Sequence, residues 1–216
     1  MSAPTGAPAL PSPGEGLSLA GFPRATLAKG TRVYRCHRSG RAHWWFASRD
    51  PAGPGGRFDL ASPRGTHYVA SDLETAVRER LRDRASGAGH VPQPFAASFA
   101  VTVTTVAKDW SCAHVDARGA ARFGVTREMA TLPPAQYGVT QAWAERFAAT
   151  GHDGIRYGAR FTPGRSNAWA LFGQAGDAER PVPAVVETVS GPDACRRIGL
   201  AVLTTPYRES VRVIPG

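Results

Sequence analysis

Cysteine is scarce in this chain and is not arranged for metal binding. The three cysteines, Cys36, Cys112 and Cys195, are an odd number without close spacing. Such a pattern disfavours both a disulfide framework and a zinc site. Cys36 precedes His37, and Cys112 lies two residues before His114, but pairs without a Cys-x-x-Cys spacing more commonly occupy ordinary core or surface positions. We therefore expect no metal site.

Long apolar runs are also missing. No stretch approaches the roughly 18 apolar residues of a membrane-spanning helix. The N-terminal sequence has neither the positively charged segment nor the apolar segment of a signal peptide. These absences predict a soluble protein that works in the cytoplasm and has no membrane partner.

Lysine is nearly absent, although the chain is strongly basic. Two lysines and 24 arginines oppose 17 acidic residues and give a formal net charge of +9. Basic chains can neutralise nucleic-acid phosphates, but these arginines are scattered along the whole sequence. The densest group alternates along one expected helix and forms no single stripe; it comprises Arg78, Arg80, Arg82 and Arg84. Nucleic-acid binding therefore stays a minority alternative, whose signature is a strongly salt-dependent affinity for DNA.

The length and composition indicate one globular domain. A chain of 216 residues with 42% hydrophobic and 20% charged residues is large enough to bury its own core. Residues 1–22 are rich in Pro, Ala, Gly and Ser and carry a single charge, which predicts a flexible leader. The folded domain is expected to span residues 23–216.

The hydrophobic pattern predicts an α+β fold, a mixed sheet with flanking helices. Helices are expected from Ser71 onward and over residues 140–150. The strand over 167–172 is apolar on both faces apart from Asn167, which places it centrally in the sheet. Residues 41–47 are aromatic and expected to be buried, whereas 109–138 are expected to be irregular. The other expected strands cover residues 31–36, 66–70, 95–106, 153–157, 182–189 and 198–204.

The first helix has a capping-box signature, Ser71-x-x-Glu74. Its apolar residues recur at helical spacing, and Gly87 lies just past its expected end; they are Leu73, Ala76, Val77 and Leu81. Glu79 falls well off this apolar face, so its carboxylate is expected to face solvent or a cleft.

Four residues are candidates for a ligand site. Arg57 follows Gly55-Gly56, where the backbone can approach a ligand closely, and its planar guanidinium matches phosphate oxygens; the alternative is a surface arginine paired with Asp59. Glu79 can orient a ribose hydroxyl or stabilise positive charge developing at a sugar carbon. The alternative for Glu79 is a solvated carboxylate paired with Arg82.

Tyr68 can stack on an aromatic ligand ring, although a tyrosine facing the core is the more common case. Arg35 shares a strand face with Val33, and a half-buried arginine needs a partner. A structural salt bridge and a ligand contact are both open for it. Other catalytic motifs are absent: the sequence contains no P-loop, no strand-anchored Gly-x-Gly-x-x-Gly and no Gly-x-Ser-x-Gly elbow.

The order of these pieces resembles the RES domain family over about residues 29–175. No single piece is specific, but the ordered set is. The matching pieces are Gly-Thr-Arg-Val-Tyr-Arg at 30–35, Gly-Arg-Phe-Asp at 56–59, Gly-Thr-His-Tyr-Val-Ala at 65–70, Glu-Thr-Ala-Val-Arg-Glu at 74–79, Gly-His-Asp-Gly-Ile-Arg-Tyr at 151–157 and Ala-Trp-Ala-Leu-Phe-Gly at 168–173.

The resemblance implies an ADP-ribosyltransferase-like toxin that consumes NAD+ as its substrate and is held inactive by an antitoxin with a helix-turn-helix-type domain. It also implies site roles: Arg35 and Arg57 would contact the NAD+ phosphates, Tyr68 would line the nicotinamide or ribose pocket, and Glu79 would be the carboxylate at the ribose. The reaction would be NAD+ hydrolysis, phosphorolysis or ADP-ribosyl transfer.

The chain departs from the family at one position. The family's serine usually lies in a Tyr-x-Ser-Arg segment, which here reads Tyr157-Gly-Ala159-Arg160. Ala159 has no hydroxyl to donate, and Ser166 is the nearest serine along the chain. The second hypothesis is therefore a catalytically inactive RES-like module that binds a nucleotide or a partner protein.

Overall fold

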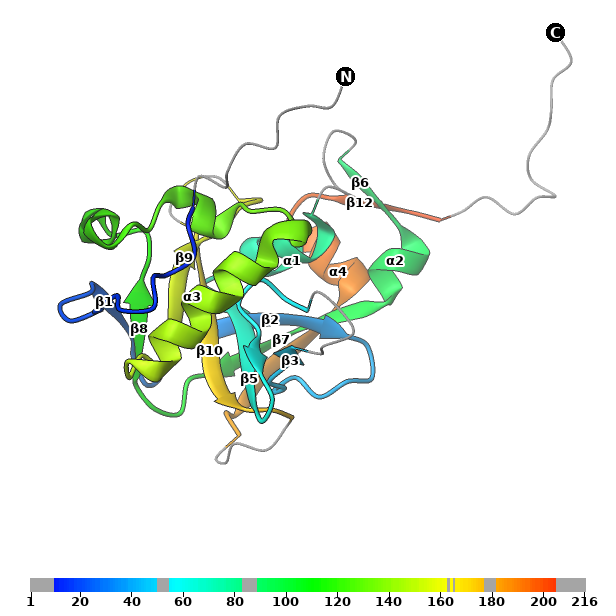
Figure 1. Ribbon diagram of the computed structural model, residues 1–216. Coiled ribbons are helices and arrows are strands. Elements are labelled where there is room, and N and C mark those ends of the chain that lie inside the picture. The colour runs from blue at the N-terminus through cyan, green and yellow to red at the C-terminus, as the bar shows by residue number, and fades with distance from the viewer. Residues whose placement is uncertain are drawn as a thin grey trace, which may run out of the picture.

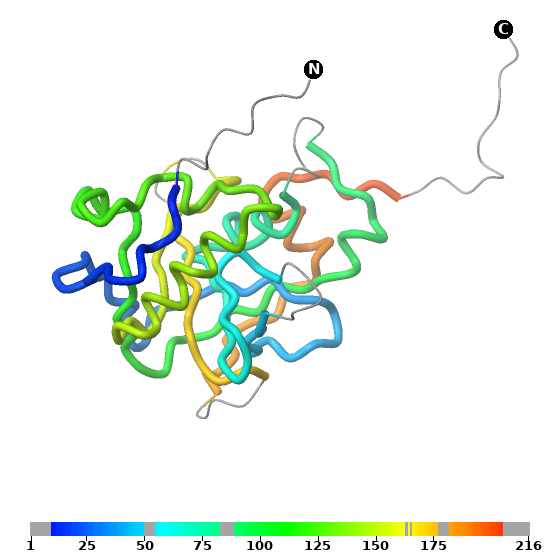
Figure 2. The backbone as a smooth tube through the Cα atoms, viewed as in Figure 1, coloured from blue at the N-terminus to red at the C-terminus, as the bar shows by residue number. Residues whose placement is uncertain are grey.

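The computed structural model describes residues 10–49, 55–82, 89–162, 164, 166–176 and 182–204 (Figures 1 and 2). Its largest element is an eight-stranded sheet with the order β1-β8-β9-β10-β5-β2-β7-β11. The sheet strands are β1 (Arg24–Leu27), β2 (Arg32–Arg38), β5 (Arg64–Ala70), β7 (Phe99–Thr105), β8 (Trp110–His114), β9 (Gly154–Gly158), β10 (Asn167–Gln174) and β11 (Val185–Ser190).

The sheet is mixed, as predicted. Its neighbouring strands pair antiparallel, apart from the parallel pair of β8 and β9. β10 lies centrally between β9 and β5, which confirms its predicted place. Two small parallel pairs accompany the sheet: β3 (Ser48–Arg49) with β4 (Leu60–Ala61), and β6 (His90–Pro92) with β12 (Ala201–Leu203). The prediction of one α+β domain with a mixed sheet is therefore confirmed.

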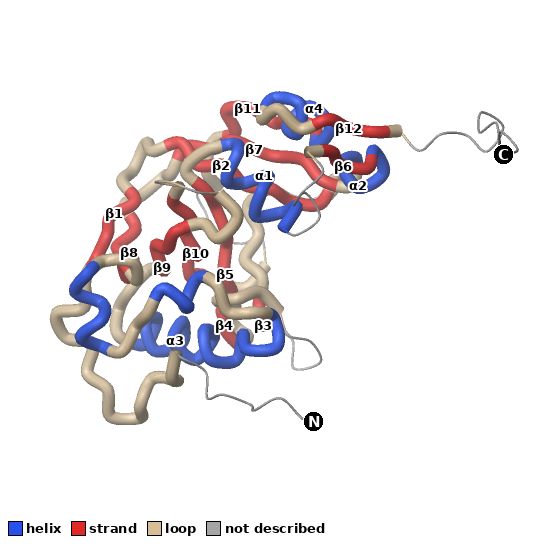
Figure 3. Tube along the Cα trace, turned by 90° about the horizontal axis from the view of Figure 1, so that it is seen from above, coloured by secondary structure: helices blue, strands red, loops and turns tan. Residues whose placement is uncertain are grey.

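Two separate groups of helices cover one face of the sheet (Figures 1 and 3). Helix α3 (Tyr137–Ala149) packs over β9 and its neighbours, and forms one core cluster with them. Helices α1 (Leu73–Leu81), α2 (Gln93–Ala97) and α4 (Gly191–Arg197) form a second cluster over β2 and β7. The opposite face is filled by a third cluster that includes Trp44 and Phe46, two of the aromatic residues predicted to be buried.

The sheet is least continuous between the two helix groups. β2 pairs with β5 at one position only, Tyr34 with Ala70, whereas β2 pairs with β7 along its whole length. The two helix groups therefore stand over two halves of the sheet that join at a narrow contact. Space is left on this face where β2 and β5 diverge.

Several element boundaries differ from the prediction. Helix α1 is capped by Asp72, whose side chain accepts a hydrogen bond from the Thr75 amide at 2.7 Å, and Ser71 donates to that carboxylate. The strand predicted over 95–106 begins only at Phe99, because prolines at 92 and 94 start the short helix α2. Strand β8 lies within the segment predicted to be irregular, and β12 belongs to the small sheet. The predicted helix stop at Gly87 lies outside the described residues.

Residues 10–22 pack into the core and differ from the flexible leader predicted for 1–22; residues 1–9 lie outside the described part. The side chains of Leu10, Leu19 and Phe22 are buried. The Trp143 indole donates to the Pro11 carbonyl at 2.9 Å, and the Arg146 guanidinium donates to the Leu17 carbonyl. Low complexity concealed this segment, because its few apolar residues are separated by Pro and Gly. In the described part of the chain, no helix is long and apolar enough to cross a membrane.

Replacing Phe22 with alanine tests whether this segment belongs to the core. The Phe22 ring contacts the rings of Phe123, Phe147 and His152. We expect Phe22→Ala to lower the free energy of unfolding by about 3–5 kcal/mol, as for other buried phenylalanines, measured by urea denaturation. Val185→Ala is the control, because Val185 is 50% exposed and should change stability by less than about 0.5 kcal/mol. Equal effects of the two substitutions would contradict the packing.

Candidate functional site

A cleft of about 310 Å³ opens on the helix-covered face, where β2 and β5 diverge. This volume is at the lower end of the range usual for small-molecule sites. The cleft is lined by four arginines, one carboxylate and five aromatic side chains, besides small residues. These polar and aromatic residues are Arg57, Arg80, Arg82, Arg160, Glu79, Tyr34, Tyr68, Tyr137, Tyr157 and Phe161. Three of the four candidates from the sequence, Arg57, Tyr68 and Glu79, therefore meet in one cleft.

The glycine-rich turn that carries Arg57 is held from below by Asp59. The Asp59 carboxylate is buried and accepts hydrogen bonds from the Gly56 amide at 2.5 Å and the Tyr68 hydroxyl at 2.8 Å. The same hydroxyl accepts from the Phe58 amide at 2.8 Å. A Cβ at position 56 would lie 2.7 Å from Asp59 Oδ1 and 2.8 Å from Tyr68 Oη, so only glycine fits there. The glycine is required by packing around a buried carboxylate.

Burial and charge tune the polar groups beneath this turn. Burial raises the pKa of Asp59, while the hydrogen bonds from Gly56 and Tyr68 act in the opposite direction. Burial, followed by the negative charge of Asp59, raises the pKa of Tyr68 well above its usual value. Tyr68 is therefore a neutral hydroxyl that donates to Asp59, and its contribution to the cleft is the ring. Tyr68 lines the cleft, and the role that the resemblance implies for it at a nicotinamide or ribose ring stays a prediction.

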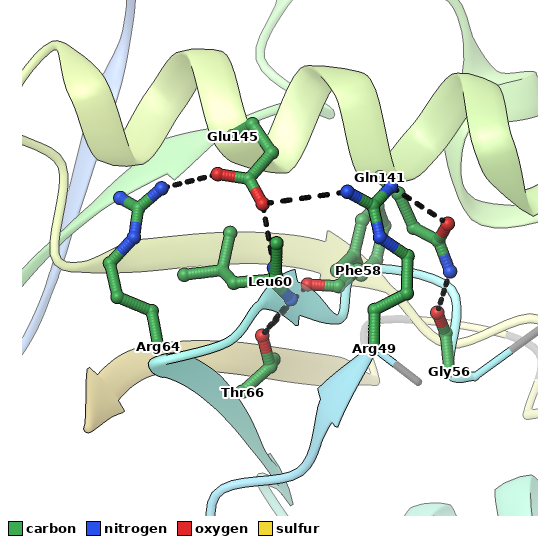
Figure 4. A network of polar contacts seen from close by, with 9 residues as sticks. Arg49, Gly56, Phe58, Leu60, Arg64, Thr66, Gln141 and Glu145 are labelled. Atoms are coloured by element: carbon green, nitrogen blue, oxygen red, sulfur yellow. Dashed lines mark hydrogen bonds and ion pairs between the residues drawn. The ribbon is translucent and has the colours of Figure 1, made fainter. Parts of the chain in front are cut away.

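Helix α3 fixes the same turn from the other side. Thr140 donates to the Arg57 carbonyl at 2.5 Å, and Gln141 donates to the Gly56 carbonyl at 2.9 Å. One turn further along α3, Glu145 accepts from the Ala61 amide at 2.7 Å and forms an ion pair with Arg64 (Figure 4).

A threonine side chain from the sheet bonds the same segment on its opposite side. Thr66 on β5 donates to the Phe58 carbonyl at 2.8 Å and accepts from the Leu60 amide at 3.3 Å. The backbone of residues 56–61 is thus bonded on both sides, by a helix and by a strand. Such restraint fixes the backbone from which the Arg57 side chain reaches the cleft.

Glu79 is the single carboxylate among the described lining residues. It stands on α1 and is half-buried, as its position off the apolar face of the helix predicted. One of its oxygens accepts a hydrogen bond from the Phe161 amide at 3.1 Å, although 82 residues separate the two in the sequence. No ion pair joins Glu79 to Arg82 among the described residues, so the predicted alternative of a solvated helix pair is not what the structure shows.

The guanidinium of Arg57 makes no ion pair with Asp59 in the described part of the chain. It donates to the Met129 carbonyl at 3.5 Å and lies 5.3 Å from the centre of the Tyr137 ring. Arg160 is arranged similarly and donates to the Thr131 carbonyl at 3.1 Å. Two arginines are therefore held against the 129–137 segment by neutral partners, and their charges are available to an anionic ligand.

Arg35 is not among the residues that line the cleft. The lining residues of β2 are Tyr34 and Cys36, and Arg35 points to the other face because side chains alternate along a strand. Its guanidinium bonds His67 Nδ1 at 2.8 Å and the Tyr68 carbonyl at 3.4 Å. Burial lowers the pKa of Arg35 to about 10. Of the two possibilities left open for Arg35, the described residues show no salt bridge: its guanidinium contacts a histidine and a carbonyl. Because Arg35 does not line the cleft, this geometry does not favour its predicted phosphate contact.

Neither Ala159 nor Ser166 is among the residues that line the cleft. Ala159 donates its backbone amide to the Ser166 carbonyl at 3.2 Å. The two residues therefore lie side by side, yet the contact between them is made by backbone atoms. The neighbours that do reach the cleft from this segment are Tyr157, Arg160 and Phe161.

Sequence reasoning missed seven of these ten polar and aromatic lining residues: Tyr34, Tyr137, Tyr157, Phe161, Arg80, Arg82 and Arg160. Tyr157 and Arg160 lie in the segment that was compared with the family's Tyr-x-Ser-Arg pattern. That comparison was the signal that could have indicated their place in the cleft. Tyr34 follows from strand alternation once the cleft is assigned to the face opposite Arg35. No sequence pattern around Tyr137 indicates its place in the cleft, because it reaches the cleft only through the packing of α3.

Comparison with known proteins assigns the family. The model of the RES domain family matches residues 32–192. This span covers most of the 216 residues, so the chain belongs to the RES domain family. A search of curated proteins returns no match.

A solved structure supports the fold. A chain in the crystal structure of the M. tuberculosis MbcT–MbcA toxin–antitoxin complex is similar to it, with a TM-score of 0.56 and 13% sequence identity; the match covers 80% of this chain and 90% of that chain. At this identity the likeness shows a shared fold. The described residues contain no group of three or more His, Cys, Asp or Glu side chains that could hold a metal ion.

Tyr68→Phe tests the network under the glycine turn. The substitution removes a donor from buried Asp59 and an acceptor from the Phe58 amide, so we expect the free energy of unfolding to fall by about 1–3 kcal/mol. Tyr34→Phe is the control, since the Tyr34 hydroxyl makes no hydrogen bond within the described residues. Urea denaturation measures both, and a Tyr68→Phe variant as stable as the control would exclude the network.

His67 should make the protein less stable in mild acid. Burial, followed by the positive charge of Arg35, lowers the pKa of His67 well below its usual value of 6.5. Below about pH 6.5 the unfolded chain takes up a proton that the folded protein does not, so stability present at pH 7 is lost as the pH falls. One such histidine contributes a slope of up to about 1.4 kcal/mol per pH unit. His67→Gln should flatten thermal stability between pH 7 and 5.5, and an unchanged slope would contradict this.

Proposed function

We propose that this chain is the toxin of a toxin–antitoxin pair and cleaves the N-glycosidic bond of NAD+. The observation that carries the proposal is one carboxylate, Glu79, placed in a cleft with four arginines and five aromatic rings. Membership of the RES domain family and a fold shared with a chain of a toxin–antitoxin complex support it. The protein would act in the cytoplasm, where NAD+ is available.

The lining residues suit the parts of NAD+. Arg57 and Arg160 offer planar, permanently charged forks for the pyrophosphate oxygens. Tyrosine rings along the cleft can stack on the adenine and nicotinamide rings. Glu79 would lie at the nicotinamide ribose, where a carboxylate stabilises the positive charge that develops at the sugar carbon.

The chemistry needs no strong general acid. When the bond between C1′ and nicotinamide breaks, its electron pair goes to the ring nitrogen, and nicotinamide leaves as a neutral molecule. C1′ becomes cationic in the transition state and is then captured by an oxygen of water, phosphate or a protein side chain. Because the leaving group takes no proton, this step needs no hydroxyl at position 159 as a proton donor. The Phe161 amide donates to the Glu79 carboxylate at 3.1 Å, which restrains this carboxylate within the cleft.

Glu79→Gln is the direct test of this function. The amide keeps the shape of the side chain but removes its charge, so we expect nicotinamide release from NAD+ to fall by about 10²–10³-fold, measured by chromatography. Glu74→Gln is the matched control on the same helix, because Glu74 pairs with Arg78 outside the cleft and its loss should leave the rate unchanged. Full turnover by Glu79→Gln would exclude the mechanism.

A second candidate function follows from Ala159. If the missing serine hydroxyl is needed for turnover, the chain is an inactive RES-like module that binds a nucleotide. Calorimetric binding of ADP-ribose without nicotinamide release from NAD+ supports this reading. Gain of release in Ala159→Ser would assign the inactivity to this position.

The proposed partner is an antitoxin with a helix-turn-helix-type domain. The support is the shared fold with a chain of a complex that contains a toxin and an antitoxin. Such a partner would hold the toxin inactive when bound. Co-purification of the chain with the product of an adjacent gene, together with loss of nicotinamide release in the complex, would test this.

A further inference from the structure

The edge of β5 behind the cleft has a gap between two backbone partners. At Ala70 it pairs with β2, and this is the single pair between the two strands. At Thr66 it pairs with Ala47 of the loop that follows β2, through backbone hydrogen bonds of 2.9 and 2.8 Å. Tyr68 lies midway between these pairs. In the described part of the chain, neither β2 nor this loop forms a backbone pair with it.

Arg35 fills this gap with its side chain. It stands on β2 and points to the face opposite the cleft, and its guanidinium donates to the Tyr68 carbonyl at 3.4 Å. The same Nη1 atom lies 2.8 Å from His67 Nδ1. A guanidinium therefore takes the place of the backbone amide that a continuous ladder would supply to Tyr68. Because this side chain reaches further than a backbone N–H, the two strands stay bonded while they diverge around the cleft.

The contact with Arg35 assigns the proton of the His67 ring. His67 Nδ1 also lies 3.0 Å from the Trp45 carbonyl, and one ring nitrogen cannot both donate to a carbonyl and accept from a guanidinium. A guanidinium N–H can only donate, so the 2.8 Å contact is favourable when Nδ1 accepts. The proton of the neutral ring is then on Nε2, which is buried and has no partner among the described residues.

Stability alone does not account for Arg35 at this position. Its Nε is also buried without a hydrogen-bond partner in the described part of the chain. Burial lowers its pKa to about 10, so the side chain keeps its charge at neutral pH. Apolar residues of similar size commonly replace buried charged groups without loss of stability. A charged side chain here therefore points to a role beyond packing.

Tyr68 connects this bridge to the front of the sheet. Its carbonyl accepts from Arg35 behind the sheet, while its hydroxyl donates to Asp59 at 2.8 Å on the side of the cleft. Asp59 also accepts from the Gly56 amide and so holds the turn that carries Arg57. Resting on the proposed function, we propose that Arg35 is a positioning residue, which holds Tyr68 and the Arg57 turn from behind the sheet and touches no substrate.

Nitrogen NMR of the wild type tests the bridge without a ligand. Above about pH 7 the His67 ring is neutral, and its two nitrogen shifts distinguish the Nδ1–H form from the Nε2–H form. We expect the Nε2–H form, and His67→Gln identifies the resonances. The Nδ1–H form would mean that the ring donates to the Trp45 carbonyl, and would overturn the bridge.

Amide hydrogen exchange tests whether the bridge restrains the turn. We expect Arg35→Met to speed exchange about 10-fold at the amides of Gly56 and Phe58, which donate to Asp59 and to the Tyr68 hydroxyl. The amides of β8, three strands away from β5, should keep their rates. Equal acceleration in β8 would reveal a general loss of stability and overturn the positioning role. Arg35→Gln is measured in its place should Arg35→Met not fold.

Calorimetric binding of ADP-ribose relates the bridge to the ligand. We expect Arg35→Met to weaken binding by about 10–100-fold, because misplaced site residues are costly. Arg35→Lys keeps the charge and a donor for the Tyr68 carbonyl and should restore most of the affinity. Arg32→Met is the matched control, since Arg32 stands exposed on the same strand and does not line the cleft. Equal effects of Arg32→Met and Arg35→Met would reduce the role to net charge and overturn the proposal.

A double-mutant cycle with Tyr68→Phe separates positioning from a direct phosphate contact. If Arg35 acts through Tyr68, Arg35→Met should cost much less affinity in the Tyr68→Phe background than in the wild type. Fold-losses that simply multiply in the double variant would show independent action, as a direct contact with the pyrophosphate predicts, and would overturn the proposal. Failure of the wild type to bind ADP-ribose would count against the proposed function, while the ring tautomer and the amide exchange would still decide the bridge.

Discussion

The buried carboxylate of Asp59 is the interaction on which the cleft depends. It accepts from the Gly56 amide and the Tyr68 hydroxyl, and so ties the arginine-bearing turn to the central sheet. A buried ionisable group is tolerated only when hydrogen bonds satisfy it, which explains why Gly56 and Tyr68 are placed so closely around it. Helix α3 adds a second set of bonds to the same turn. The position of Arg57 is therefore set by buried polar contacts that no ligand has to form.

The fold places the cleft where the two helix groups meet. One core cluster contains α3 and the other contains α1, α2 and α4, and the sheet beneath them is joined at one β2–β5 pair. Arg57 belongs to the first half and Glu79 to the second. The hydrogen bond from the Phe161 amide to Glu79 links the halves. A site assembled in this way brings a carboxylate and arginine side chains together without a glycine-rich nucleotide loop.

Local pattern predicted the sheet and three residues of the cleft, but not the parts that depend on distant packing. The apolar strand over 167–172 was placed correctly in the centre, and Arg57, Tyr68 and Glu79 meet as expected. Arg35 was expected at the ligand but contacts His67 instead, because strand alternation turns Tyr34 toward the cleft and Arg35 away from it. Arg82 was not predicted to line the cleft, since it follows the last helical residue with φ 52°, where helical spacing no longer applies. Residues 10–22 were misjudged because composition alone cannot reveal that Trp143 and Arg146 bind their carbonyls.

Helix α3 is shared between the start of the described chain and the cleft. Trp143 and Arg146 hold residues 11–17 on one side, while Thr140 and Gln141 hold the Arg57 turn on another. A version of the protein beginning at residue 23 would expose an apolar strip on α3 and remove the contacts that restrain it. The choice of starting residue for expression thus bears on the geometry of the cleft, and a loss of activity in a shortened protein would not by itself implicate any residue of the site.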